Sequence, residues 1–330
     1  MKTDAEFLSF IKNDLSDVFD LLEKERLKVK KALLMMLVPS ITCFLLAFPL
    51  FFLFRTAFFS FIAIVLAIII GLIIYISCVK APYDSYKLDY KFKLIQKIVK
   101  FINPGLSYNP SGGIPQSKYM MSKIFTKVPD RYRAEDYVSG KLDKTFIEFS
   151  EIHSEYKTET RDKNGVKHEH WHTIFRGIFI IADFNKDFRG RTLVLPDIAE
   201  KFMGFLGQIL QSWNLARDQL VKLEDPEFEK LFVVYSTDQI EARYILSTSL
   251  MRKLIEFNHK AKNIYNAKTY FSFVGSKLFV AISSSKNLFE PPIMKAVNEK
   301  KILIEYFSFM NLAASIVEDL DLNTRIWSKT

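Results

Sequence analysis

An apolar block runs from Leu33 to Val79 and is interrupted by a single charged residue, Arg55. The block divides into Leu33–Phe54 and Ala57–Val79, and neither half contains Asp, Glu, Lys or Arg. An α-helix rises about 1.5 Å per residue and the hydrocarbon core of a bilayer is about 30 Å thick, so each half is long enough to cross it. The two residues between the halves allow only a tight antiparallel turn. The sequence therefore predicts a two-helix transmembrane hairpin over residues 33–79.

Basic residues flank this block on both sides. Because Lys and Arg next to a membrane span favour the cytoplasmic side, we expect both chain termini in the cytoplasm and the turn at Arg55 outside it. The same charges suit anionic lipid headgroups, at about 1 kcal/mol for each basic residue near the surface. The candidate headgroup contacts are Lys24, Arg26, Lys28, Lys30, Lys31, Lys80, Lys87 and Lys91.

The chain carries a formal net charge of +9. A basic chain can bind nucleic acid, but no nucleic-acid recognition motif accompanies the charge, so we expect no nucleic-acid partner. The sequence also contains no glycine loop for phosphate, no G-x-S-x-G nucleophile elbow and no Cys-x-x-Cys pair. We therefore predict no cofactor.

The apolar pattern divides the chain into four segments. Residues 1–32 carry apolar side chains at helical spacing from Phe7 to Leu22 and predict a cytoplasmic amphipathic helix. The hairpin occupies residues 33–79. Residues 80–115 predict a juxtamembrane helix followed by a linker rich in Pro and Gly. Residues 116–330 are left for a cytoplasmic domain.

That last segment alternates strand-like and helix-like runs. Phe146–Lys157 and His170–Phe184 are rich in β-branched and aromatic residues and flank an Asn-Gly pair, the strongest short signal of a β-hairpin. Lys268–Val274 and Lys277–Ser283 predict a second hairpin, and the apolar spacing from Asp197 to Trp213 predicts a helix. Strand pairs separated from helices predict an α+β domain with a mostly antiparallel sheet flanked by helices.

His168-Glu169-His170-Trp171-His172 matches the H-E-x-x-H pattern of zinc proteases. In those enzymes the two His share one face of a helix. Here the match follows an Asn-Gly turn and runs into strand-like sequence, so we expect a strand. On a strand His168, His170 and His172 share one face and Glu169 lies on the other. Alternate His on a strand can hold a metal ion, and the other interpretation is an exposed polar face of a hairpin. We keep the three His as candidate metal ligands.

Two further polar patterns carry chemistry in other proteins. Asp183-Phe184-Asn185-Lys186-Asp187 resembles the start of a calcium loop, but the sequence lacks the Gly and the final Glu of that loop, which favours a turn instead. Asp238, Glu241 and Arg243 form a dense polar group. Buried ion pairs, helix caps or catalysis would each explain it.

Several longer runs resemble the middle of a known family. They are Phe175-Arg176-Gly177, Asp183–Lys186, Phe188–Thr192, Leu223–Phe228 and Val234–Tyr244. Over roughly residues 80–320 the chain resembles the bacterial membrane proteins that contain domain of unknown function 3137. The resemblance implies a bacterial inner-membrane protein with an N-terminal helix, a membrane hairpin and an α+β region. It implies no established activity and no catalytic residues.

Together these features predict a hairpin-anchored, multi-pass protein of the bacterial inner membrane. Its cytoplasmic α+β domain is expected to bind a protein or a lipid without catalysis. The expected partners are a bilayer with anionic headgroups and either an unidentified protein or a second copy of the chain. The alternative function is a membrane-tethered, metal-dependent enzyme that uses the His cluster at residues 168–172.

Overall fold

The computed structural model describes residues 2–54, 65–66, 68–69, 71–73, 75–163, 165–184, 187–197, 219–320 and 322, and the side chains of 36–54 and of Tyr265 lie outside that description. The chain forms two compact units. The helical unit comprises Thr3–Ile98 and Phe289–Glu305. The sheet unit comprises Met1–Lys2, Val99–Leu288 and Tyr306–Thr330.

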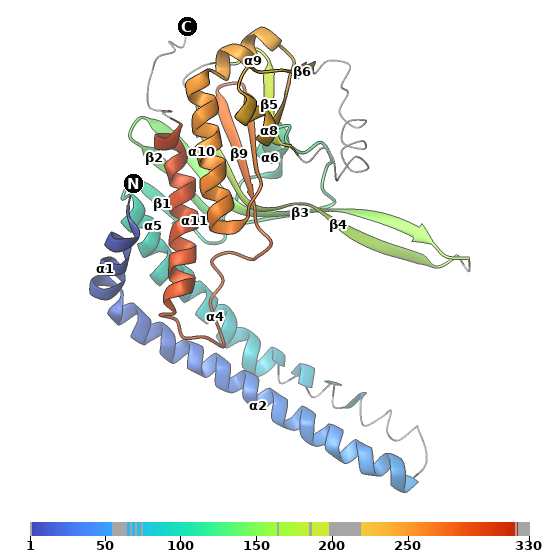
Figure 1. Cartoon of the computed structure of the whole chain (residues 1–330). Helices are drawn as coiled ribbons and strands as arrows, with labels where there is room; N and C mark the ends of the chain where they lie inside the picture. Colours follow the sequence, from blue (N-terminus) through green and yellow to red (C-terminus); the bar gives the residue numbers. More distant parts are fainter. Residues whose placement is uncertain are drawn as a thin grey trace. The chain divides into compact units, whose positions relative to one another are not determined.

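The first helix begins at a reciprocal cap. The Thr3 side chain accepts a hydrogen bond from the backbone N–H of Glu6, and the Glu6 carboxylate accepts one from the backbone N–H of Thr3. The predicted apolar stripe is buried at Phe7, Ile11, Leu15, Phe19 and Leu22. The helical elements of this part of the chain are α1 (Asp4–Asp14), α2 (Ser16–Phe54), a π-helix (Tyr75–Lys80), α4 (Ala81–Tyr90), a second π-helix (Lys91–Ile95) and α5 (Gln96–Ile102) (Figure 1).

The predicted transmembrane hairpin is contradicted. Among the described residues, no helix combines the length and the apolar character that crossing a bilayer requires. The described side chains of α2 end at Met35 and are rich in charge, and the second predicted span is described only in short helical pieces before the π-helix Tyr75–Lys80. The predicted multi-pass inner-membrane localisation with cytoplasmic termini depends on this hairpin and is contradicted by the same finding. Residues 55–64, around the predicted turn, lie outside the described residues. Several described apolar side chains of the second predicted span are exposed, namely Val65, Leu66, Ile68, Ile69, Leu72 and Ile73.

The sheet unit is built on a nine-stranded sheet in the order β1-β2-β3-β4-β9-β8-β5-β7-β6. Every neighbouring pair is antiparallel, so the predicted α+β class with a mostly antiparallel sheet is confirmed. The strands are β1 (Leu106–Asn109), β2 (Arg131–Leu142), β3 (Thr145–Arg161), β4 (Lys167–Asp183), β5 (Arg191–Pro196), β6 (Gln219–Val221), β7 (Phe232–Ser236), β8 (Thr269–Val274) and β9 (Lys277–Ser283). The helices are α6 (Gln116–Met121), α8 (Pro226–Leu231), α9 (Gln239–Ile245), α10 (Thr248–Tyr265) and α11 (Lys300–Asp319).

Both predicted hairpins are present, as β3–β4 and β8–β9. Gly275 takes a positive φ in the turn of the second one, a conformation that glycine adopts at no steric cost. The closing helix α11 starts at Lys300. The helix predicted from Asp197 to Trp213 lies almost entirely outside the described residues.

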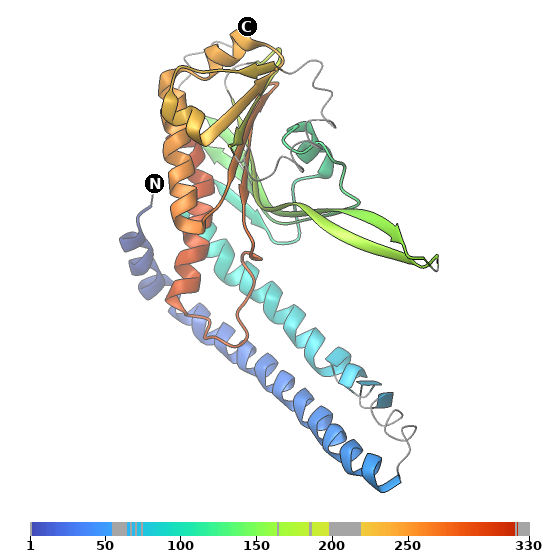
Figure 2. The same ribbon diagram turned by 45° about the vertical axis from the view of Figure 1, so that its right-hand side comes forward.

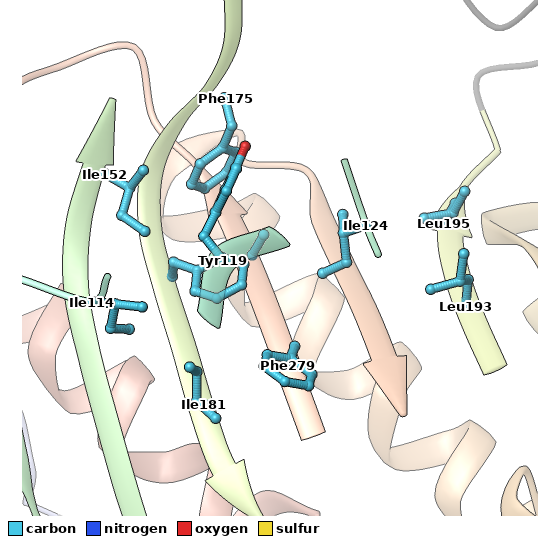
Figure 3. Close-up of a cluster of buried hydrophobic side chains, with 11 residues drawn as sticks. Ile114, Tyr119, Ile124, Ile152, Phe175, Ile181, Leu193, Leu195 and Phe279 are labelled. Carbon is cyan, nitrogen blue, oxygen red and sulfur yellow. The ribbon is translucent and has the colours of Figure 1, made fainter. Parts of the chain in front are cut away.

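The two faces of the sheet are covered differently. On one face Tyr119 of α6 packs with Ile152, Phe179 and Phe279 of the central strands, and Ile114 and Ile124 extend this cluster (Figure 3). The Tyr119 hydroxyl hydrogen-bonds Ser154 Oγ at 2.9 Å, and burial raises the pKa of that hydroxyl. The other face is covered by α10, whose Phe257 ring lies 6.0 Å from the ring of Phe271 on β8. Burial on both faces explains the near-continuous apolar runs of the central strands.

Candidate functional site

The longest strands of the sheet extend beyond their neighbours. β3 and β4 contain 17 residues each, but β2 pairs with β3 only as far as Glu155 and β9 pairs with β4 only from Gly177. Beyond these limits Tyr156–Arg161 pairs with Lys167–His172 and with no other strand among the described residues. We call this two-stranded extension the arm. It projects away from the sheet in both views (Figures 1 and 2).

The strand register divides the arm into two faces. Residues directly opposite each other in an antiparallel pair share a face. Tyr156 lies opposite His172, Thr158 opposite His170 and Thr160 opposite His168, so one side is the histidine face. The other side, the charged face, carries Lys157, Glu159, Arg161, Lys167, Glu169 and Trp171. The three His therefore lie on a strand, as the sequence predicted, and Glu169 lies on the opposite face.

Each imidazole of the histidine face has its own surroundings. His172 Nε2 lies 2.8 Å from Thr158 Oγ1, and the His172 ring stacks on Tyr156 with 4.8 Å between the ring centroids. His168 Nε2 lies 3.5 Å from Asp162 Oδ2. In the part of the chain that the structure describes, no three His, Cys, Asp or Glu side chains gather into a group able to hold a metal ion. The described side chains thus offer no three-ligand centre for the metal-dependent enzyme.

Ion pairs cross the charged face. Lys157 Nζ lies 3.0 Å from carboxylate oxygens of both Glu159 and Glu169, and Lys167 Nζ lies 3.4 Å from Glu159. The hydrogen bonds to Glu159 and Glu169 raise the pKa of Lys157, and the hydrogen bonds from Lys157 and Lys167 lower the pKa of Glu159. Exposed pairs of this kind contribute little to stability, but alternating charges on a strand edge oppose uncontrolled pairing with other chains.

The base of the arm is fixed by three contacts from the β2 side. The Arg131 guanidinium lies over the Trp171 ring, 3.9 Å from its centroid, and Lys127 Nζ lies 3.2 Å from the centroid of Tyr156. Cations attract the faces of aromatic rings in this geometry. The Asp130 carboxylate accepts a hydrogen bond of 2.7 Å from the backbone N–H of Lys157. None of these contacts has a short sequence motif, and the sequence did not predict them.

The dense polar group around Asp238 forms a clamp between two loops. We define the clamp as residues 189–192 together with residues 236–241. The Glu241 carboxylate accepts hydrogen bonds from the backbone N–H groups of Arg189 and Gly190, at 3.0 and 2.8 Å. The Asp238 carboxylate caps α9 by accepting from the backbone N–H groups of Ile240 and Glu241. Among the three explanations that the sequence allowed, a helix cap accounts for Asp238, whereas Glu241 holds the backbone of a neighbouring loop, a role that none of the three named.

Ser236 completes the clamp from β7. Its Oγ lies 2.9 Å from the backbone carbonyls of both Arg191 and Asp238 and can donate its hydrogen to either one. It also lies 3.1 Å from Thr192 Oγ1. Ser236 and Thr192 are fully buried. A hydroxyl surrounded by backbone acceptors in this way is satisfied structurally, so the clamp positions two loops and offers no free nucleophile in its described residues.

A second cap occurs in the Leu223–Phe228 run. The Asp225 carboxylate accepts hydrogen bonds from the backbone N–H groups of Glu227 and Phe228 and starts α8, with Pro226 at its first position. The Glu229 carboxylate reaches back to the backbone N–H of Leu223 at 2.8 Å. The acids of this run therefore also serve local backbone structure.

Three of the eight candidate headgroup contacts are bound within the helical unit. Arg26 is buried and donates to the Glu23 carboxylate and to the backbone carbonyl of Ile293. Lys87 and Lys91 both lie near Glu290, with Nζ to Oε1 distances of 2.7 and 3.5 Å. The remaining five, which are exposed or half-buried, are Lys24, Lys28, Lys30, Lys31 and Lys80. Lipid contact by these five residues stays a prediction.

Comparison with known protein families finds one match, over part of the chain. Residues 173–322 match the family described as Protein of unknown function (DUF3137). No curated protein matches the chain. Among solved structures, the crystal structure of the mycobacterial trehalose monomycolate transport factor A, TtfA, aligns with 66% of this chain and 92% of its own, at 12% sequence identity and a TM-score of 0.34. The clamp lies inside the matched residues, and the match begins one residue after the arm. The match covers residues 173–322, a shorter stretch than the residues 80–320 over which the motifs suggested a resemblance.

Proposed function

We propose that this chain is a binding protein without catalytic activity of its own and that the arm is where it contacts a protein partner. The observation that carries the proposal is the pairing of the arm: residues 156–161 and 167–172 pair with each other, and no other described strand covers either long edge. A two-stranded ribbon is only marginally stable alone, so its extension beyond a stable sheet calls for a role outside the fold.

The backbone of the arm supports this proposal. Alternate residues of an antiparallel pair direct their N–H and C=O groups toward the partner strand and away from it. The backbone N–H of Asp162 donates to the carbonyl of Val166 across the arm. On the opposite edge of β3, the carbonyl of Glu155 accepts from Asp130, and the N–H of Lys157 donates to Asp130. By this alternation, Glu159 on β3 and Glu169 on β4 direct their backbone groups outward. An extended segment of a partner can hydrogen-bond along such an edge.

The side chains favour the edge of β4 over that of β3. Asp130 occupies the first outward N–H of β3, at Lys157, whereas the outward positions of β4 include Glu169 and the partly exposed Trp171. Tryptophan combines a large apolar area with an N–H donor and is enriched where proteins bind each other. The β4 edge therefore offers both backbone hydrogen bonds and an aromatic anchor.

Crosslinking in cells that express the chain tests the proposal. A photoreactive amino acid at Glu169, on the outward β4 edge, is expected to form a discrete adduct with another protein. The same group at Glu227, exposed on α8, serves as the matched control and is expected to form none. Shortening the arm, by joining Tyr156 to His172 through an Asn-Gly turn, removes the edge but keeps the sheet register.

The shortened chain separates binding from folding. It is expected to keep the circular dichroism spectrum and thermal unfolding of the parent sheet and to compete poorly in crosslinking. Two results would show that the arm is not the contact site. One is an adduct that forms equally from Glu227. The other is a shortened chain that prevents adduct formation as well as an equal concentration of the wild-type chain does.

A further inference from the structure

Three of the five histidines of the chain lie on one face of the arm, and partner contact along the β4 edge makes no use of them. The histidine face contains His168, His170 and His172, and opposite them Thr160, Thr158 and Tyr156. Neutral imidazole is the commonest protein ligand for metal ions.

The spacing suits chelation by neighbouring pairs. Residues i and i+2 on one strand face are about 6.6 Å apart along the strand. Two imidazoles that lean toward each other across that distance can share one ion with metal–nitrogen bonds of about 2.0–2.1 Å. Two pairs meet this condition, His168 with His170 and His170 with His172.

The charges on the arm favour a cation on this face. The basic side chains of the paired strands, Lys157, Arg161 and Lys167, alternate onto the opposite face. The Asp162 carboxylate lies 3.5 Å from His168 Nε2, at the end of the arm near the turn. A carboxylate beside a ligating imidazole orients the ring and raises its basicity as a ligand. At the other end, Lys127 approaches Tyr156 and adds positive charge near His172.

The surroundings of the rings distinguish the two pairs. His172 is held by the hydroxyl of Thr158 and by stacking on Tyr156, so turning it toward a metal would break both contacts. His170 is exposed, and its ring makes no hydrogen bond or ion pair with the described residues; only its backbone carbonyl accepts from Thr158 Oγ1, at 3.5 Å. His168 is also exposed, and its ring can bind a metal ion while it keeps its contact with the Asp162 carboxylate. The pair nearer the turn is therefore free to adopt the chelating geometry.

We propose that His168 and His170 chelate one divalent transition-metal ion on the histidine face, with Asp162 as a positioning residue for His168. Water or a ligand from another molecule completes the coordination. For a given site the affinity for Cu²⁺ is expected to exceed that for Ni²⁺ and that for Zn²⁺. The inference rests on the fold of the arm and does not require a protein partner.

Titration calorimetry of the full chain, purified without a polyhistidine tag, with Ni²⁺ as the probe tests this assignment. One ion per chain is expected. His168→Gln and His170→Gln are each expected to weaken binding by more than about tenfold, because the loss of an outer-shell partner alone typically costs about 10–100-fold. His172→Gln is expected to stay within about threefold of the parent, and His259→Gln, on α10, is the control that should match it.

Three results would overturn the assignment. They are no uptake of Ni²⁺ at about 0.1 mM, a loss in His172→Gln as large as that in His168→Gln, and a loss in the His259→Gln control. Circular dichroism of each variant establishes that it is folded, which is expected because all four positions are exposed. Asp162→Asn is expected to weaken Ni²⁺ binding less than either ligand variant does, and an equal loss would make Asp162 a direct ligand.

Discussion

The clamp and the arm look alike in the sequence, because both are short runs dense in charged and hydroxyl side chains, but the structure uses them in opposite ways. In the clamp, the carboxylates of Asp238 and Glu241 each accept two backbone N–H groups. In the arm, Lys157, Glu159 and Glu169 pair with one another in the open. Polar side chains that satisfy backbone groups stabilise a fold, whereas polar side chains that pair on an exposed ribbon leave its backbone edges accessible.

The family match follows the same division. It includes the clamp and begins at Thr173, directly after the arm. The motifs that identify the family are thus largely motifs of folding. The contacts of this particular chain are better sought in the arm, which lies outside the matched residues. Variants that treat the two regions in parallel can break this distinction.

The largest expected effect is the loss of the Glu241 carboxylate. Glu241→Ala leaves the backbone N–H groups of Arg189 and Gly190 without their acceptor. Water can replace the carboxylate at the exposed N–H of Arg189, so the loss of the two charge-assisted hydrogen bonds is expected to cost about 2–3 kcal/mol together. Urea unfolding should show that decrease in the free energy of unfolding of the sheet unit. Glu169→Ala on the arm is the matched control, with no measurable change in the unfolding midpoint. Equal destabilisation by both variants would remove the distinction.

Two glycines provide the next comparison. A Cβ at Gly190 would lie 2.6 Å from Thr237 Oγ1, a short side chain held by the backbone N–H of Arg191. Gly190→Ala is therefore expected to cost about 2 kcal/mol, because the clamp must open to admit a methyl group. At Gly165 in the turn of the arm, a Cβ would meet nothing within 4 Å, and only its φ of +81° resists substitution. Gly165→Ala is expected to cost about 1 kcal/mol. Thermal unfolding of both variants measures the difference, and a larger loss at Gly165 would contradict it.

A helix cap gives a smaller effect. Asp238→Ala removes the acceptor for the backbone N–H groups of Ile240 and Glu241 in the first turn of α9 and is expected to cost about 1 kcal/mol in the free energy of unfolding. Asp238→Asn keeps a capping oxygen and should retain most of that stability. Urea unfolding of the two variants checks the explanation, and a loss with Asn as large as with Ala would mean that the charge of Asp238 acts elsewhere in the clamp.

Part of this architecture could be predicted from local sequence and part could not. The antiparallel hairpin at the arm followed from an Asn-Gly pair between β-rich runs, because turn geometry is set by adjacent residues. The full length of the arm did not, since Thr158–Arg161 is polar and resembles a loop. Its strand state depends on cross-strand pairing, which is not visible in one strand at a time. The clamp was detected as a polar group, but its role depended on backbone N–H groups about fifty residues away.

The apolar block shows the reverse error. Length and hydropathy of Leu33–Val79 predicted a transmembrane hairpin, and the described helices contain none. The lysine-rich flanks were assigned to lipid headgroups because of their charge. Arg26, Lys87 and Lys91 also have intramolecular partners that lie far along the chain, and lipid contact by the flanks stays a prediction.

The smallest expected effect is a pH dependence confined to the arm. The pKa of Glu159 is lowered by its hydrogen bonds to Lys157 and Lys167, so its contribution is present above its ordinary pKa of 4.5 and is lost as the pH falls through the lower value. The pKa of Lys157 is raised, so its contribution is present below 10.5 and is lost as the pH rises through the higher value. Amide hydrogen exchange in the arm, corrected for intrinsic rates, should therefore be slowest between these limits. Lys157→Met should remove the alkaline limb of that profile and weaken the acid limb, which Lys167 still supports, while leaving exchange in the clamp unchanged. If exchange in the clamp followed the same pH profile, the two regions would unfold together and the arm would not be an independent element.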